Sequence, residues 1–100
     1  MLNFDYIKDE PSLKSLYHFC NVAELTQLSD PETSAINSRK ALEWIVRAIY
    51  AIKGLEIGER TSLFELVDGE PFKGFVANDK LMMAVHYIRK VGNAAAHSGT

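Results

Sequence analysis

The chain has 100 residues, 47% of them hydrophobic and 24% charged, with one cysteine and a formal net charge of −2 at pH 7. This size and composition match one globular domain and exclude a disordered chain, and a single cysteine excludes an internal disulfide or a cysteine metal cluster. The excess of acidic over basic residues argues against a dedicated nucleic-acid-binding protein. The sequence has no long apolar run and no signal peptide, so the protein is expected to be cytoplasmic and not inserted in a membrane.

Two long helices are predicted in the first half of the chain. Apolar residues at helical spacing indicate the first one over about residues 11–28. A start signal for the second follows, because Asp30 suits the N-cap, Pro31 the first helical position and Glu32 the positive end of the helix dipole. This second helix is expected to end at Gly54, a favourable C-terminal cap.

The second helix is expected to present two distinct faces. Its apolar residues step by three or four positions and form a seam that we expect to face the core: Leu42, Ile45, Ile49 and Ile52. Its charged face repeats at a spacing of four and consists of Arg39, Glu43 and Arg47, whose ion pairs stabilise a helix only weakly.

A short helix is predicted after a loop that begins at Leu55. It starts near Thr61 or Ser62 and ends at the pair Asp68-Gly69. Residues 71–75 are rich in turn formers but include two phenylalanines. We therefore expect this segment to pack against the core as a non-helical plug.

The last helix is predicted to begin at Asn78 or Asp79, either of which suits the N-cap, and to continue to about His97. Alternation of period two is not sustained anywhere, so strands are not expected. The prediction for residues 1–100 is a single all-α domain: a helical bundle of three longer helices plus a short connecting helix.

The last helix carries one polar stripe. At 100° per residue, His86, Lys90 and Asn93 fall within about 40° of His97, and Arg89 lies on the flank of this stripe. The residues on the other side are expected to face the core: Leu81, Val85, Ile88, Gly92 and Ala95. The simplest interpretation of the stripe is the solvated side of an amphipathic helix.

Gly92 favours a more specific interpretation of this helix. A glycine inside a helix costs about 1 kcal/mol relative to alanine, so a close packing contact is expected there. Three alanines at positions 94–96 follow Asn93 and keep the same turn narrow. This pattern suits a tight helix contact or a self-associating face.

Three stretches of the chain resemble a known helical domain. They are the start Phe4-Asp5-Tyr6-Ile7, the motif Arg39-x-x-x-Glu43 within residues 38–46, and the ending Gly92-Asn93-x-x-x-His97 within residues 87–97. The domain that they resemble has an uncharacterised function. It is best known from the N-termini of type I restriction endonuclease R (motor) subunits, and it is usually grouped with the HEPN superfamily of helical domains.

The resemblance implies an all-α accessory domain that precedes a nuclease and an ATP-driven DNA translocase. The chain ends three residues after His97 without a closing element, which also predicts a fragment of a longer protein. No cofactor is expected in this domain, whereas the parent protein would use ATP and Mg²⁺. The implied partners are other domains or subunits of the restriction complex, DNA through that complex, and a second copy in a homodimer.

Two functions follow from these residues. The leading hypothesis is a non-catalytic interaction domain, and the alternative is a HEPN-type ribonuclease or nucleotide-binding domain that uses His97 with Asn93. Active ribonucleases of that superfamily place their histidine closer to the arginine than the seven residues that separate Arg89 from His97. They also usually carry an arginine where Gly92 stands, so we expect no catalysis.

The candidate binding or interface residues lie on the two longest predicted helices: Arg39, Glu43, Arg89, Lys90, Asn93 and His97. We expect Arg39 or Glu43 to lie beside Asn93 or His97 in the folded chain. No metal site is expected, because no histidine pair has the spacing of a zinc-binding helix.

Overall fold

The computed structural model describes residues 4–97, apart from the Tyr6 side chain, and this part of the chain is helical without a strand. The all-α prediction is therefore confirmed for the described residues. In chain order the elements are η1 (Asp5–Ile7), η2 (Pro11–Leu13), α1 (Lys14–Thr26), α2 (Pro31–Ile52), α3 (Leu63–Asp68), α4 (Glu70–Val76) and α5 (Asp79–His97).

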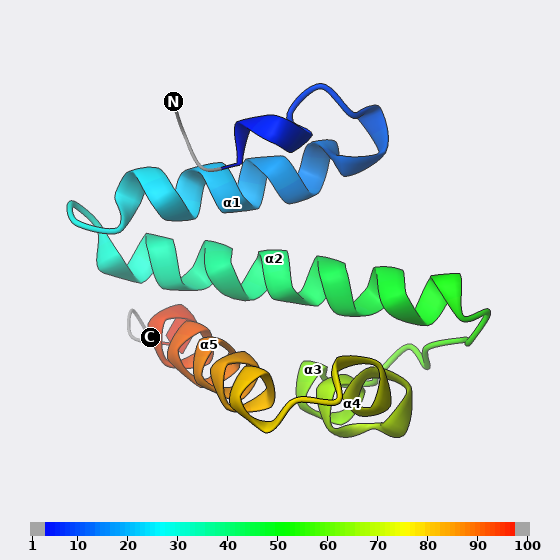
Figure 1. The fold of residues 1–100 in the computed structure, drawn as a ribbon. Helices are drawn as coiled ribbons and strands as arrows, with labels where there is room; N and C mark the ends of the chain where they lie inside the picture. Colours follow the sequence, from blue (N-terminus) through cyan, green and yellow to red (C-terminus); the bar gives the residue numbers. More distant parts are fainter. Residues whose placement is uncertain (1–3, 98–100) are drawn as a thin grey trace.

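Helix α2 is the centre of the arrangement, and it contacts each of the other α-helices. Helix α1 runs antiparallel to α2 along one side, while α5, α3 and α4 lie on the opposite side (Figure 1). The short helices α3 and α4 lie near the C-terminal end of α2, in the same view. A helix with neighbours on two sides must bury residues around much of its circumference, and this determines which of its side chains reach the core.

The start of α2 follows the predicted capping signal. The Asp30 side chain accepts hydrogen bonds from the Thr33 hydroxyl at 2.6 Å and from the Thr33 backbone N–H at 3.2 Å, with Pro31 at the first helical position. These hydrogen bonds lower the pKa of Asp30, and the one from the Thr33 hydroxyl has the larger effect. Beyond the other end of the helix, Gly54 has a φ of 73°, a conformation that favours glycine.

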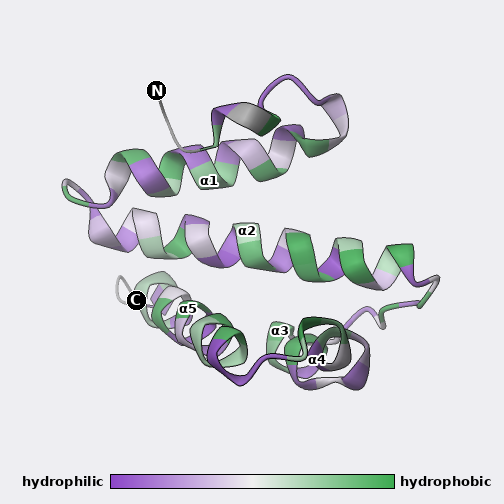
Figure 2. Cartoon of the chain, in the orientation of Figure 1, coloured by the Kyte–Doolittle hydropathy of each residue, from purple (hydrophilic) through white to green (hydrophobic). Residues whose placement is uncertain are grey.

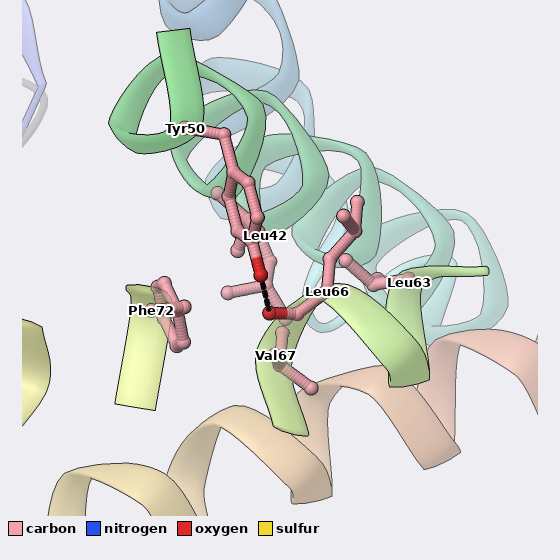
Figure 3. Close-up of a cluster of buried hydrophobic side chains, with 7 residues drawn as sticks. Leu42, Tyr50, Leu63, Leu66, Val67 and Phe72 are labelled. Carbon is pink, nitrogen blue, oxygen red and sulfur yellow. Dashed lines mark hydrogen bonds between the residues drawn. The ribbon is translucent and has the colours of Figure 1, made fainter. Parts of the chain in front are cut away.

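The most deeply buried side chains gather where the C-terminal half of α2 meets α3 and α4 (Figure 3). The Tyr50 hydroxyl donates a buried hydrogen bond of 2.7 Å to the Leu66 carbonyl, which ties α2 to α3. Buried polar groups need such partners. The buried cluster consists of Leu42, Val46, Tyr50, Leu63, Leu66, Val67 and Phe72.

The predicted apolar seam of α2 was partly wrong. Ile45 is 41% exposed and Ile52 is 84% exposed, whereas Val46 is fully buried. The cause is that α3 and α4 pack on a different side of α2 than α1 does. Residues 46 and 50 of α2 are therefore buried against α3 and α4. Leu81 was also expected in the core, but it is 55% exposed, and the next residue, Met82, packs against the buried cluster instead.

The segment over residues 71–75, predicted as a non-helical plug, belongs to helix α4. Pro71 lies in the first turn, where its missing N–H costs nothing, and Glu70 favours the same helix end. Ala77 ends the helix in the left-handed region, with φ of 46°. Of the two aromatics, Phe72 is 3% exposed as expected, but Phe75 points outward and is 62% exposed.

Helix α5 crosses α2 in direct contact at Gly92, which is buried. A Cβ atom on Gly92 would lie 2.5 Å from the Arg39 Cβ and 3.0 Å from the Ala35 carbonyl oxygen. Both neighbours belong to α2, and the carbonyl is part of its backbone. The close packing contact predicted for this glycine is therefore confirmed, and its partner is α2.

Replacing Gly92 is expected to destabilise the fold. Gly92→Leu should lower the free energy of unfolding by about 1–3 kcal/mol, because overpacking forces the two helices apart. Gly92→Ala should also destabilise, since even the added methyl group overlaps Arg39. Thermal and denaturant unfolding of the variants measure both effects.

The matched control is Gly74, a helical glycine of α4 whose added Cβ would approach no atom closer than 3.8 Å. Gly74→Ala should stabilise by up to about 1 kcal/mol through helix propensity alone. If both alanine variants stabilised the chain equally, the contact at Gly92 would not be as close as described.

Candidate functional site

Helix α5 presents its polar stripe away from the core. Lys90 and His97 are exposed, while His86 and Asn93 are half-buried. On the opposite side, Val85 and Ile88 pack against the buried cluster. The stripe predicted from the helical period is thus present on one face of α5, and Gly92 fixes which way that face points.

Arg89 is oriented toward α3 rather than toward the end of α5. Its guanidinium carbon lies 4.9 Å from the centre of the Phe64 ring, and its Nε donates a long hydrogen bond of 3.4 Å to His86 Nδ1. The rings of Phe64 and His86 are 6.0 Å apart. These three residues are called here the Phe64–His86–Arg89 cluster. Phe64 was not among the predicted site residues, because only the placement of α3 brings it to α5.

Arg39 and Glu43 form part of a charged row on α2. Glu43 accepts from Arg47 Nε at 3.2 Å and lies 4.0 Å from Arg39 Nη2. Ion pairs of this partly exposed kind contribute at most about 1 kcal/mol. The Arg39 stem covers Gly92, the residue before Asn93. A shared site that joins Arg39 or Glu43 to Asn93 or His97 stays a prediction.

This arrangement provides little of what phosphodiester cleavage needs. A general base acts on a bound substrate when a cation holds the phosphate beside it. His97 is exposed in the last turn of α5, and Arg89 is engaged with His86 and Phe64. Within residues 4–97, no three histidine, cysteine, aspartate or glutamate side chains are grouped to hold a metal ion.

A second exposed face of α5 is apolar. Met83 is 73% exposed, Tyr87 69% and Val91 37%, and they repeat every four residues. Figure 2 shows hydrophobic residues between hydrophilic ones along this helix. Hollows of about 590 Å³ and 330 Å³ border this face, the second one lined in part by Pro31 and Ala35 of α2. We call Met83, Tyr87 and Val91 the α5 apolar stripe; it was not predicted from the sequence.

A further hollow of about 410 Å³ lies where α1, α2 and α5 meet. Its lining includes Ala41, Leu42 and Ile88, with Cys20 on the α1 side. Cys20 is half-buried, and this burial raises the pKa of its thiol. A raised pKa lowers the fraction of thiolate at neutral pH, and the thiolate is the reactive form of cysteine.

Comparison with protein-family models, curated proteins and solved structures finds no match to this chain. Among the described residues, no helix combines the length and the apolar character that a membrane span requires.

The raised pKa predicts how Cys20 reacts. Its alkylation by iodoacetamide should reach half its maximal rate at a higher pH in the folded chain than in the chain unfolded in denaturant. The folded state also prefers the neutral thiol, so this stabilisation holds below the unfolded pKa and is lost as the pH rises through the folded pKa. A reaction midpoint at lower pH in the folded chain would contradict this assignment.

Proposed function

We propose that this chain is a non-catalytic helical interaction domain, the N-terminal accessory domain of a type I restriction R subunit. The parent protein would be an ATP-dependent DNA translocase and endonuclease, with ATP and Mg²⁺ bound outside this domain. The occupant of the interaction surface would be another domain or subunit of the same complex. The sequence resemblance of the Arg39-x-x-x-Glu43 and Gly92-Asn93-x-x-x-His97 motifs supplies this context.

The observation that carries the proposal is the α5 apolar stripe. Methionine and tyrosine are enriched at protein interfaces, and contiguous exposed apolar side chains mark such interfaces. The stripe lies on a helix whose opposite side is held against α2 at Gly92, so it is presented on a rigid support. The hollows beside it offer recesses for side chains of a partner.

The alternative, a ribonuclease that uses His97, has less support. Arg89 is directed to Phe64 and His86, and the buried Gly92 stands where active ribonucleases of that superfamily usually carry an arginine. Binding of nucleic acid does not require these catalytic groups, so the interaction hypothesis and a nucleic-acid contact are compatible.

The stripe is expected to bind the remainder of the parent protein. Tyr87→Asp should abolish that binding when the two parts are mixed, because a charge would enter an apolar contact. Ile52→Asp is the matched control, since it places the same charge at another large, exposed hydrophobic residue, which is 84% exposed and lies at the end of α2. Calorimetry on the two variants and the unchanged chain makes the comparison.

Two outcomes would contradict this proposal. A gene that encodes no ATP-driven motor beyond residue 100 would remove the restriction context. Sedimentation that shows a stable homodimer disrupted by Tyr87→Asp would assign the stripe to a second copy of this chain rather than to another subunit.

The isolated chain is expected to leave RNA intact. Incubation with single-stranded RNA should give no cleavage by the unchanged chain or by His97→Ala, because the Arg89 guanidinium is directed to Phe64 and His86 instead of to a reacting phosphate. A known ribonuclease provides the positive control on the same substrate. Cleavage by the unchanged chain that disappears in His97→Ala would move the protein to the ribonuclease class.

A further inference from the structure

Three cation–aromatic pairs lie on the surface of the described chain, and one of them differs from the others. Lys40 lies 5.9 Å from the Phe19 ring centre, and Lys53 lies 5.8 Å from that of Phe75. The third pair, Arg89 on Phe64, is closer at 4.9 Å. It alone uses a planar guanidinium, a group that can stack on an aromatic ring with one face and on a second planar group with the other.

Within residues 4–97, Arg89 takes no part in the ion pairs that join Arg39 and Arg47 to Glu43 and Lys73 to Asp68. A guanidinium that folding does not neutralise retains its attraction for an anion. The positive charge is reinforced locally, because α5 carries three basic residues and one acidic residue, although the whole chain has a net charge of −2.

His86 fixes the direction of this guanidinium. Arg89 Nε donates to His86 Nδ1 at 3.4 Å, so this nitrogen is engaged with Arg89. The terminal Nη groups of Arg89 are not used in this hydrogen bond and can donate to a ligand. Lys90 is the next residue and is exposed, so a second cation is available beside the same imidazole.

The fold does not need this cluster to join α3 to α5. The two helices already meet through Leu66 and Val67, which are 3% and 0% exposed, with Val85 packed against the buried cluster. Phe64, in contrast, keeps 48% of its surface exposed. A ring in contact with a cation and still open to solvent is more suited to a ligand than to a core.

We propose that the Phe64–His86–Arg89 cluster binds an unpaired nucleotide of a single-stranded nucleic acid. A base stacks on the open face of the Arg89 guanidinium, so that the guanidinium lies between the base and Phe64. The adjacent phosphate accepts hydrogen bonds from the Arg89 Nη groups and receives the charge of Lys90. Single strands are favoured over duplexes, because only unpaired bases expose their faces for stacking.

Two different residues distinguish this site from the proposed interaction with another subunit. Arg89 lies about 160° from Tyr87 on a helical projection, although His86 and Lys90 also line the hollow beside Met83 and Tyr87. Tyr87→Asp tests the stripe and Arg89→Ala tests the nucleotide site, so a failure of one proposal is distinguishable from a failure of the other.

The test measures fluorescence anisotropy of a labelled single-stranded oligonucleotide, titrated with the full chain at low salt. Arg89→Ala should weaken binding about tenfold, as expected for the loss of one stacked base and one phosphate contact. Lys53→Ala removes an equal charge and a cation–aromatic pair at Phe75, so it is the matched control. It should change the affinity by less than about twofold.

Arg89→Lys separates stacking from charge. It should weaken binding while the slope of log affinity against log salt stays unchanged, because the charge remains and the planar stack is lost. Arg89→Ala should reduce the magnitude of that slope by about 0.7, the value for one phosphate contact on a single strand. Thermal melting of each variant confirms that the fold is retained.

Several results would overturn the proposal. They are an affinity of Arg89→Ala equal to that of Lys53→Ala, an affinity of Arg89→Lys equal to that of the unchanged chain, and equal binding of a duplex with the same sequence. Inorganic phosphate is the competitor in a last experiment, at the same concentration as the phosphate groups of the oligonucleotide. Full displacement of the oligonucleotide would also overturn the proposal, because it would show a phosphate site without base stacking.

Discussion

The contact between α5 and α2 at Gly92 determines how the surfaces of this protein are arranged. A helix without a side chain at this position comes within van der Waals distance of the Arg39 stem and the Ala35 carbonyl. Any larger residue would separate the two helices. Because a helix is rigid over its length, this one contact also decides which residues of α5 face the core, the solvent and α3.

Because of that orientation, three sides of α5 have different surroundings. Its inner side contributes Val85 and Ile88 to the packing around the buried cluster. One outer side carries the α5 apolar stripe, and another carries the cluster in which the Arg89 guanidinium lies 4.9 Å from the Phe64 ring centre. These two sides are the surfaces that we propose for binding.

The features that the sequence predicted well are those with local causes. Asp30 and Pro31 define the start of α2 through contacts within one helical turn, and Gly92 indicated close packing because an internal glycine otherwise destabilises a helix. The predictions were wrong where the burial of a residue depends on helices that are distant in the sequence. Ile45 was expected in the core but is 41% exposed, and Val46 is buried instead, because α3 and α4 approach α2 from their own direction. Phe64 joined Arg89 through tertiary packing, which no spacing within a single helix reveals.

The most direct test of this account is a nuclear Overhauser measurement on the isotope-labelled chain of 11.2 kDa. The account predicts strong cross-peaks between the Gly92 α-protons and the side-chain protons of Arg39, because a Cβ on Gly92 would lie 2.5 Å from the Arg39 Cβ. Absence of these cross-peaks, with the neighbouring contacts of Ile88 still visible, would show that α5 does not pack on α2 in this way. The orientation of both binding surfaces would then be contradicted.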